Sequence, residues 1–381
     1  MSTSPFDNDR GMPRADRADR AGSERSGGGR KRRRDGGRRG DPNATVPDVE
    51  FTSYYGRNVV KPAPWTHEIA DYLFLGGLAA GSALIGAGAS ITGRKRLRRR
   101  ARLSSLVAVG LGGNALIADL GRPERFLNMM RTVKLTSPMS VGSWILAGFS
   151  VTTGAATALG ILRDDLTFTN ELREKLHLEG PVSSELLKYA DGLMTGGSAF
   201  FSPPLAAYTA VLLADTATPL WHQSYRELPF IFVSSGTAAG AGLAMITTPT
   251  SETGPVRQLA VVAGAADLVA DKLLERRLGE EGQPLHEGAA GTLHTAAKAL
   301  TMVGMAGAIV AGRSRAANAV AGVALLAGSA CTRYAFWKAG NASAEDPIYT
   351  IRPQRRRAEA KRAKGLGVDQ PGGEWPGHSG R

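Results

Sequence analysis

The chain has 381 residues, of which 43% are hydrophobic and 21% are charged, and its formal net charge is +13. These totals would suit a soluble protein, but the charges concentrate at the two ends and leave a middle rich in Gly, Ala, Leu and Val. This segregation favours one membrane core with two tails over several soluble domains. The single cysteine, Cys331, excludes a disulfide framework and a Cys-ligated iron–sulfur cluster within the chain.

Both ends of the chain are basic. Residues 1–60 contain few apolar side chains and include five consecutive basic residues at 30–34, and residues 341–381 include three consecutive arginines at 355–357. We expect the first 60 residues to form a disordered arm, without the apolar stretch of a secretory signal. In a membrane protein, both tails are expected to bind anionic lipid or the acidic face of a partner rather than nucleic acid.

The core, residues 61–340, contains eight predicted membrane spans. Four runs of at least 22 residues lack Asp, Glu, Lys and Arg, and a helix needs only about 20 apolar residues to cross a bilayer. These runs are 72–93, 135–162, 192–214 and 228–251. Four further spans are predicted around the shorter runs 103–118, 258–270, 299–312 and 316–332. Because a bilayer offers the backbone no water, the spans are expected to be helices, which predicts an all-α integral membrane protein.

Two further patterns bear on packing and orientation. Gly77-x-x-x-Gly81 and Gly236-x-x-x-Gly240 permit close approach of helices. Residues 94–102 hold seven basic residues and no acid, which predicts a cytoplasmic position for the first loop. An even number of spans then places both termini on the opposite side, although the basic tails favour the reverse orientation.

The first span begins with three titratable residues, His67, Glu68 and Asp71, between the aromatic residues Trp65 and Tyr72. Such a group can relay protons at a membrane surface. The acids also fit a solvated helix start, where the helix dipole favours negative charge. The aromatic pair is typical of interfacial anchors.

The second span ends with Asp119, followed by Arg122 and Pro123. An ion pair between Asp119 and Arg122 would reduce the cost of placing both charges at the membrane boundary. Pro123 is expected to end or kink the helix.

Three more residues within the later spans are candidates for chemistry. Tyr208 follows the pair Pro203 and Pro204, which is expected to kink or interrupt its helix. A phenol inside a span needs a partner, either another helix or a ligand. Asp267 and Asp271 are four residues apart and so share one helix face, where they form a proton path or simply mark the end of a span.

The histidines argue against a haem. None of the six is expected in the middle of a span, and a transmembrane b-haem needs two axial histidines within the bundle. From the residues alone, the chain is a polytopic helical protein with titratable groups at the ends of its spans.

Three blocks of sequence resemble the NrfD / polysulfide reductase membrane-subunit family. They are residues 72–81 (YLFLGGLAAG), 119–126 (DLGRPERF) and 137–144 (SPMSVGSW). Weaker agreement occurs at Tyr208 and at Arg333 with Tyr334, so the resemblance extends from Trp65 to about Tyr349.

The resemblance implies two four-helix bundles without haem, in the plasma membrane of a bacterium. It also implies binding of menaquinone or ubiquinone, and electron exchange with a partner that carries [4Fe–4S] clusters and connects to a catalytic subunit, often a molybdopterin enzyme. The quinone-binding candidates carried over or adjoining the motifs are His67, Glu68, Tyr72 and Tyr208. The candidates for proton transfer are Asp71, Asp119, Arg122, Asp267 and Asp271.

Two alternatives to a quinone-reactive subunit remain at this point. One is a proton-conducting or transporter module in which Asp119, Asp267 and Asp271 line a pathway. The other is a passive membrane anchor for a peripheral enzyme.

Overall fold

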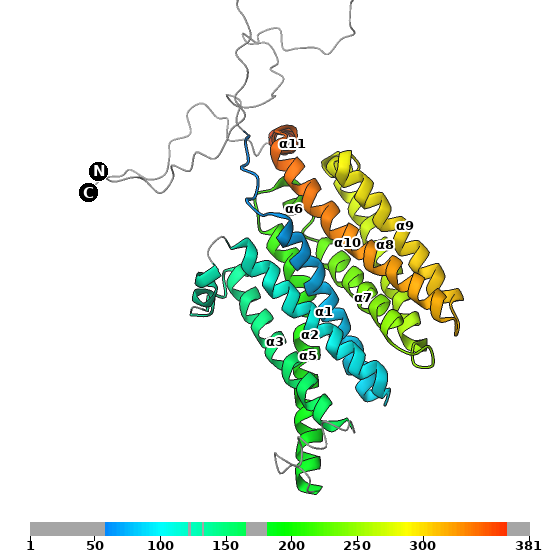
Figure 1. Cartoon of the computed structure of the whole chain (residues 1–381). Helices are drawn as coiled ribbons and strands as arrows, with labels where there is room; N and C mark the ends of the chain where they lie inside the picture. The colour runs from blue at the N-terminus through cyan, green and yellow to red at the C-terminus, as the bar shows by residue number, and fades with distance from the viewer. Residues whose placement is uncertain (1–57, 121–122, 132, 165–180, 364–381) are drawn as a thin grey trace, which may run out of the picture. The chain divides into compact units, whose positions relative to one another are not determined.

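A computed structural model describes residues 58–120, 123–131, 133–164 and 181–363, and these ranges contain helices and no strand. Eight helices are 20 residues or longer (Figure 1): α1 His67–Ile91, α2 Lys95–Asp119, α3 Pro138–Arg163, α5 Pro181–Ala214, α7 Leu228–Thr247, α8 Gly254–Leu278, α9 Gly288–Val310 and α10 Arg315–Glu345. The other helical elements are η1 Pro123–Met130, α6 Pro219–Gln223, η2 Gly279–Leu285 and α11 Ile348–Ala363. Each predicted span coincides with one long helix, which confirms the all-α fold.

Seven of these helices are long and apolar enough to cross a membrane, within the described residues. The exception is α8, which has 25 residues but carries Asp267 and Asp271 among its apolar side chains. It packs between α7 and α9, and its outer face is apolar, with Val262 66% exposed and Val269 60% exposed. Lipid-facing valines and buried acids are the arrangement expected of a transmembrane helix that carries charge inward. We therefore count α8 as the eighth span.

The helices form two four-helix bundles. The first bundle consists of α1, α2, α3 and α5, and the second consists of α7, α8, α9 and α10. In both bundles, the closest packing joins the first helix with the second and the third with the fourth, and the first helix also packs against the fourth. The two bundles meet mainly where α1 crosses α7, with α5 also touching α7 (Figure 1).

Glycine makes the crossing of α1 and α7 possible. A Cβ on Gly81 would stand 2.5 Å from the carbonyl oxygen of Gly236, and one on Gly240 would stand 2.7 Å from the carbonyl carbon of Gly81. Gly77 likewise lies against Gly236. The two predicted small-residue motifs therefore face each other, and the backbones touch with no side chain between them.

Successive long helices run in opposite directions, so their ends gather at two membrane faces. The His67 face holds the start of α1 and the end of α2, where the carboxylate of Asp119 accepts hydrogen bonds from Thr66. The Arg98 face holds the start of α2 and the end of α7, where the backbone N–H of Leu97 donates to Glu252 over 2.9 Å. The described candidate residues lie toward the His67 face, except Asp267, which lies near the middle of α8.

A buried ion cluster closes the first bundle near the Arg98 face. Arg102, 5% exposed, donates to the Asp191 carboxylate over 2.6 Å and to the carbonyl oxygen of Ala156 over 2.8 Å. It also donates to the hydroxyl of Thr195 over 2.6 Å, and Arg163 pairs with the second carboxylate oxygen of Asp191. We call Arg102, Asp191 and Arg163 the Arg102 cluster. It joins α2, α3 and α5.

Two details differ from the sequence-based expectations. The proline pair does not interrupt α5, which continues through Pro203 and Pro204 to Ala214. Prolines are tolerated in transmembrane helices when neighbouring helices and local adjustments satisfy the freed backbone groups. At the other end, α10 continues to Glu345, five residues into the expected tail, and α11 follows.

Candidate functional site

The first candidate site is built on the opening turns of α1. Helical spacing places Glu68, Asp71 and Tyr72 on one side of this helix. Tyr72 is only 1% exposed, and its hydroxyl has no hydrogen-bond partner of good geometry among the described residues. The hydroxyl of Tyr208, from α5, lies close enough to that of Tyr72 for the two phenols to interact. We call Glu68, Asp71, Tyr72 and Tyr208 the tyrosine site.

A glycine of α3 makes room for Tyr208. A Cβ on Gly142 would fall 1.8 Å from the Tyr208 ring, so any other residue would displace the tyrosine. Gly142 belongs to the block 137–144 that resembles the family. This contact gives the block a physical role, since it holds the ring in place against α3.

The second bundle also contributes to the tyrosine site. The hydroxyl of Tyr334, on α10, donates to the carboxylate of Asp71 over 2.6 Å. One turn along, the indole N–H of Trp337 donates to the carbonyl oxygen of Trp65 over 3.3 Å, and Trp65 stacks on Trp221 with ring centroids 5.6 Å apart. The start of α1 is therefore held by aromatic residues from α6 and α10.

Asp119 caps the chain just before α1 begins. Its carboxylate accepts from both the backbone N–H of Thr66, over 3.1 Å, and the Thr66 hydroxyl, over 2.6 Å. It therefore ties the end of α2 to the entry of α1. Arg122, the expected partner of Asp119, lies outside the described residues.

His67 stands at the edge of the tyrosine site. Its side chain is 66% exposed, and its Nδ1 lies 3.3 Å from a carboxylate oxygen of Glu68. It points to the surface, whereas Tyr72 and Tyr208 lie inside. Of the four quinone-binding candidates, the structure thus brings Tyr72 and Tyr208 together, and it places His67 beside Glu68 at the surface.

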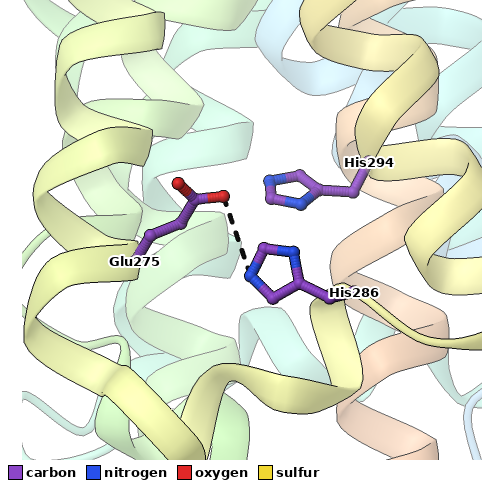
Figure 2. Close-up of side chains that lie close together, drawn as sticks. All are labelled: Glu275, His286 and His294. Atoms are coloured by element: carbon purple, nitrogen blue, oxygen red, sulfur yellow. Dashed lines mark ion pairs between the residues drawn. The ribbon is translucent and has the colours of Figure 1, made fainter.

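The second candidate site, which we call the α8–α9 cluster, contains Asp271 and Glu275 of α8 and His294 and Lys298 of α9. The imidazole of His294 is 2.8 Å from one carboxylate oxygen of Asp271, and the ammonium of Lys298 is 3.0 Å from the other. Lys298 also pairs with Glu275. The exposed His286, at the end of η2, lies 3.7 Å from Glu275, with His294 beside the pair (Figure 2). His286 completes a series of polar groups that reaches the His67 face, where η2 joins α8 to α9.

Asp267 lies one turn deeper than Asp271 and is 6% exposed. Its Oδ1 is buried without a hydrogen-bond partner among the described residues. The positive charge of Arg333, on α10 and fully buried, acts on it. Arg333 donates to the carbonyl oxygen of Phe232 over 2.7 Å and to the hydroxyl of Ser235 over 3.1 Å. Its guanidinium also lies 3.9 Å from the centre of the Phe232 ring.

Sequence reasoning missed six participants in these sites: Tyr334, Arg333, Glu275, His286, His294 and Lys298. Arg333 and Tyr334 belong to a block of weaker agreement with the family, which assigns them no role. His294 is not expected in the middle of a span and receives no role from the sequence, because the charge-free run begins only at residue 299, whereas α9 begins at Gly288. His294 and Lys298 are four residues apart, as are Asp267 and Asp271, so each pair shares one helix face. This spacing is the sequence pattern that could have identified them as a facing set of acids and bases.

The two sites differ in the chemistry that they offer. The tyrosine site presents two phenols and two carboxylates at a membrane face, which can donate and accept hydrogen bonds with a planar dicarbonyl ligand. The α8–α9 cluster is a series of acid and base groups leading inward from the surface, which suits proton exchange.

The chain matches the family described as polysulphide reductase, NrfD over residues 57–254, just over half of its length. The match covers the first bundle, α6 and α7, and it ends at the first residue of α8. A comparison with curated proteins finds no match. Family membership implies a multi-pass membrane subunit of a quinone-linked oxidoreductase. The match, the paired bundles and the three sequence blocks agree: the chain belongs to the NrfD, polysulphide reductase family.

Proposed function

We propose that the chain is the quinone-reactive subunit of an oxidoreductase complex and exchanges electrons between menaquinone or ubiquinone and an iron–sulfur partner. The observation that carries the proposal is the Tyr72–Tyr208 pair. A buried phenol without a good hydrogen-bond partner is costly unless a ligand or another group satisfies it. A quinone carbonyl oxygen is an acceptor that both hydroxyls could bind.

The surrounding groups fit the proton balance of the reaction. Oxidation of a quinol to a quinone releases two electrons and two protons, and reduction takes up the same number. Tyr208 and Tyr72 would bond the quinone oxygens, and Asp71 and Glu68 would pass protons between the ligand and water at the His67 face. The two electrons would go to, or come from, a [4Fe–4S] partner connected to a catalytic subunit of the molybdopterin type.

Charge distribution supports one orientation for this reaction. The Arg98 face includes the seven basic residues of 94–102, and Arg257, Arg313 and Arg315 add to them. Positive charge next to spans marks the cytoplasmic side. The His67 face, and with it the tyrosine site, would then face away from the cytoplasm.

A second candidate function is proton conduction through the α8–α9 cluster. The specific observation is Asp267, a buried acid whose Oδ1 has no hydrogen-bond partner in the described part of the chain and which lies one turn from the paired acid Asp271. In this role Asp267 and Asp271 would exchange protons with His294 and the surface. The same groups can serve a quinone-reactive subunit, so the two functions are compatible.

The decisive variant is Tyr208→Phe, measured in the complete complex as quinol-dependent turnover. Removing the hydroxyl should reduce turnover by about 10²-fold, the range of a lost acid–base or hydrogen-bonding group in a reaction site. The matched control is Tyr189→Phe, on the same helix, where the side chain is 74% exposed and turnover should not change.

Other outcomes separate the alternatives. Normal turnover in Tyr208→Phe, with the complex assembled, would reject the quinone site and leave a passive anchor. Ion flux in liposomes without any redox partner would establish a transporter instead.

A further inference from the structure

Glu275, His286 and His294 stand together where the α8–α9 cluster reaches the surface (Figure 2). Each offers one ligand atom, and the three atoms lie within 4.8 Å of one another. We propose that these residues form a binding site for a divalent transition metal of the zinc class. The inference does not depend on the proposed function, because metal binding involves neither quinone nor partner.

The donor set is the first argument. Two imidazoles and one carboxylate are ligands that Zn²⁺ prefers, and three protein ligands plus water complete a common four-coordinate site. To reach zinc bonds of about 2.0–2.1 Å, each ligand atom would move by less than about 1 Å. The ligands come from α8, the end of η2 and α9, so the metal would join the α8–α9 turn to both helices.

The second argument is the orientation of His294. Its Nε2 lies 2.8 Å from the carboxylate of Asp271, so a neutral ring that donates this hydrogen bond leaves the lone pair on Nδ1 available. A carboxylate that orients a ligating histidine through its second nitrogen is a recurrent arrangement in metal sites and raises the basicity of the ligand. Asp271 therefore serves as the orienting group.

Lys298 is the competing cation at this site, because its ammonium pairs with Glu275. It also lies 3.0 Å from Asp271. If a metal displaces Lys298 from Glu275, the ammonium of Lys298 remains paired with Asp271. No buried charge is then left without an oppositely charged partner. Lys272, which is 3.2 Å from the other oxygen of Glu275, is largely exposed and can turn to water.

The third argument is access. The side chain of His286 is 53% exposed, that of Glu275 is 13% exposed, and His294 is buried. A metal arriving from water would meet His286 first, then Glu275 and finally His294. The site thus has an entry path as well as ligands, both of which a metal site requires.

The test uses the full-length protein, purified without a polyhistidine tag, and titrates it with Zn²⁺ by calorimetry and with Co²⁺ by visible absorption. We expect one ion per chain, with cobalt bands typical of four or five ligands, and a higher unfolding temperature at saturating Zn²⁺. His286→Ala should weaken binding by at least about 10-fold, and Asp271→Asn by about 10- to 100-fold through loss of the orienting group. The control His222→Ala removes another exposed histidine, on α6, and should bind as the wild type does.

Two results would overturn the proposal. The first is the absence of stoichiometric binding by the wild-type protein. The second is binding by His286→Ala and Glu275→Gln with wild-type affinity, which would show that any metal is held elsewhere. Because His286 is exposed, its replacement leaves the packing of the bundle intact, and loss of binding cannot be attributed to unfolding.

Discussion

The two bundles both bury charged side chains, but they satisfy them differently. In the Arg102 cluster of the first bundle, both oxygens of Asp191 are paired with arginines, and among the buried side-chain atoms of the cluster in the described residues the Nε of Arg102 alone has no hydrogen-bond partner. In the second bundle, Asp267 keeps one oxygen without a partner in the described residues, and Asp271 shares its charge with His294 and Lys298. The first cluster lies near the Arg98 face and the second nearer the His67 face.

The difference indicates two uses of charge in a membrane. A cluster in which every charged group has an oppositely charged partner fixes the relative positions of helices and is costly to break, because each charge depends on its direct partner. An acid with an unpaired oxygen contributes little to packing, and its retention inside a span points to proton exchange or ligand binding. Stability should therefore respond to loss of the Arg102 cluster, and turnover to loss of Asp267.

The largest effect is expected for Asp191→Asn. This change removes the negative charge between Arg102 and Arg163 and should lower the free energy of unfolding by about 3–5 kcal/mol. Thermal unfolding of the purified protein in detergent would measure the loss. Glu185→Gln, which breaks an exposed pair with Lys188, is the control and should cost no more than about 1 kcal/mol. Equal unfolding temperatures for both variants would remove the contrast between the bundles.

Asp267→Asn should lower turnover strongly and stability only slightly, in contrast to Asp191→Asn, which should mainly lower stability. Quinol-dependent turnover is expected to fall by about 10²-fold, as for other lost acid–base groups. Stability should fall by less than about 2 kcal/mol, because no hydrogen bond to the Asp267 Oδ1 is lost. The measurement pairs a turnover assay of the complex with thermal unfolding of the same preparation. Should Asp267→Asn unfold as readily as Asp191→Asn, both clusters would be structural.

The smallest effect is expected at the junction between the bundles. Gly81→Ala places a methyl group against the Gly236 carbonyl and should destabilise the protein by about 1–3 kcal/mol. Gly88→Ala, on the same helix, meets nothing within 4 Å and should be neutral or slightly stabilising. Thermal unfolding of the two variants sharpens the comparison, since the difference in their unfolding temperatures measures how much the contact between the bundles contributes to stability. Identical unfolding temperatures would contradict the close crossing.

The transmembrane architecture could be predicted from sequence because it depends on local composition. Runs without charge marked the spans, since few charges are tolerated in hydrocarbon. The two glycine motifs identified the crossing surfaces of α1 and α7, because only residues without a side chain permit that approach. The shared face of Asp267 and Asp271 followed from helical periodicity.

The partners within the sites could not be predicted, because they depend on how the bundles pack. Tyr334 bonds Asp71 across 263 positions of sequence, and Thr66 bonds Asp119 across 53. No local pattern connects such pairs. Of the two expected effects of the proline pair, a kink or an interruption of α5, the interruption does not occur, since the effect of proline on a helix depends on the neighbouring groups that satisfy the backbone.

The glycine crossing of α1 and α7 also restricts large-scale movement. Alternating access in many transporters requires one bundle to rock against another around a central site. Here the contact lies between two backbones, with no rotatable side chain in between. Rocking would have to separate the helices and expose peptide groups along the seam, whereas electron exchange requires no such motion. The crossing therefore favours a protein that works as one rigid unit.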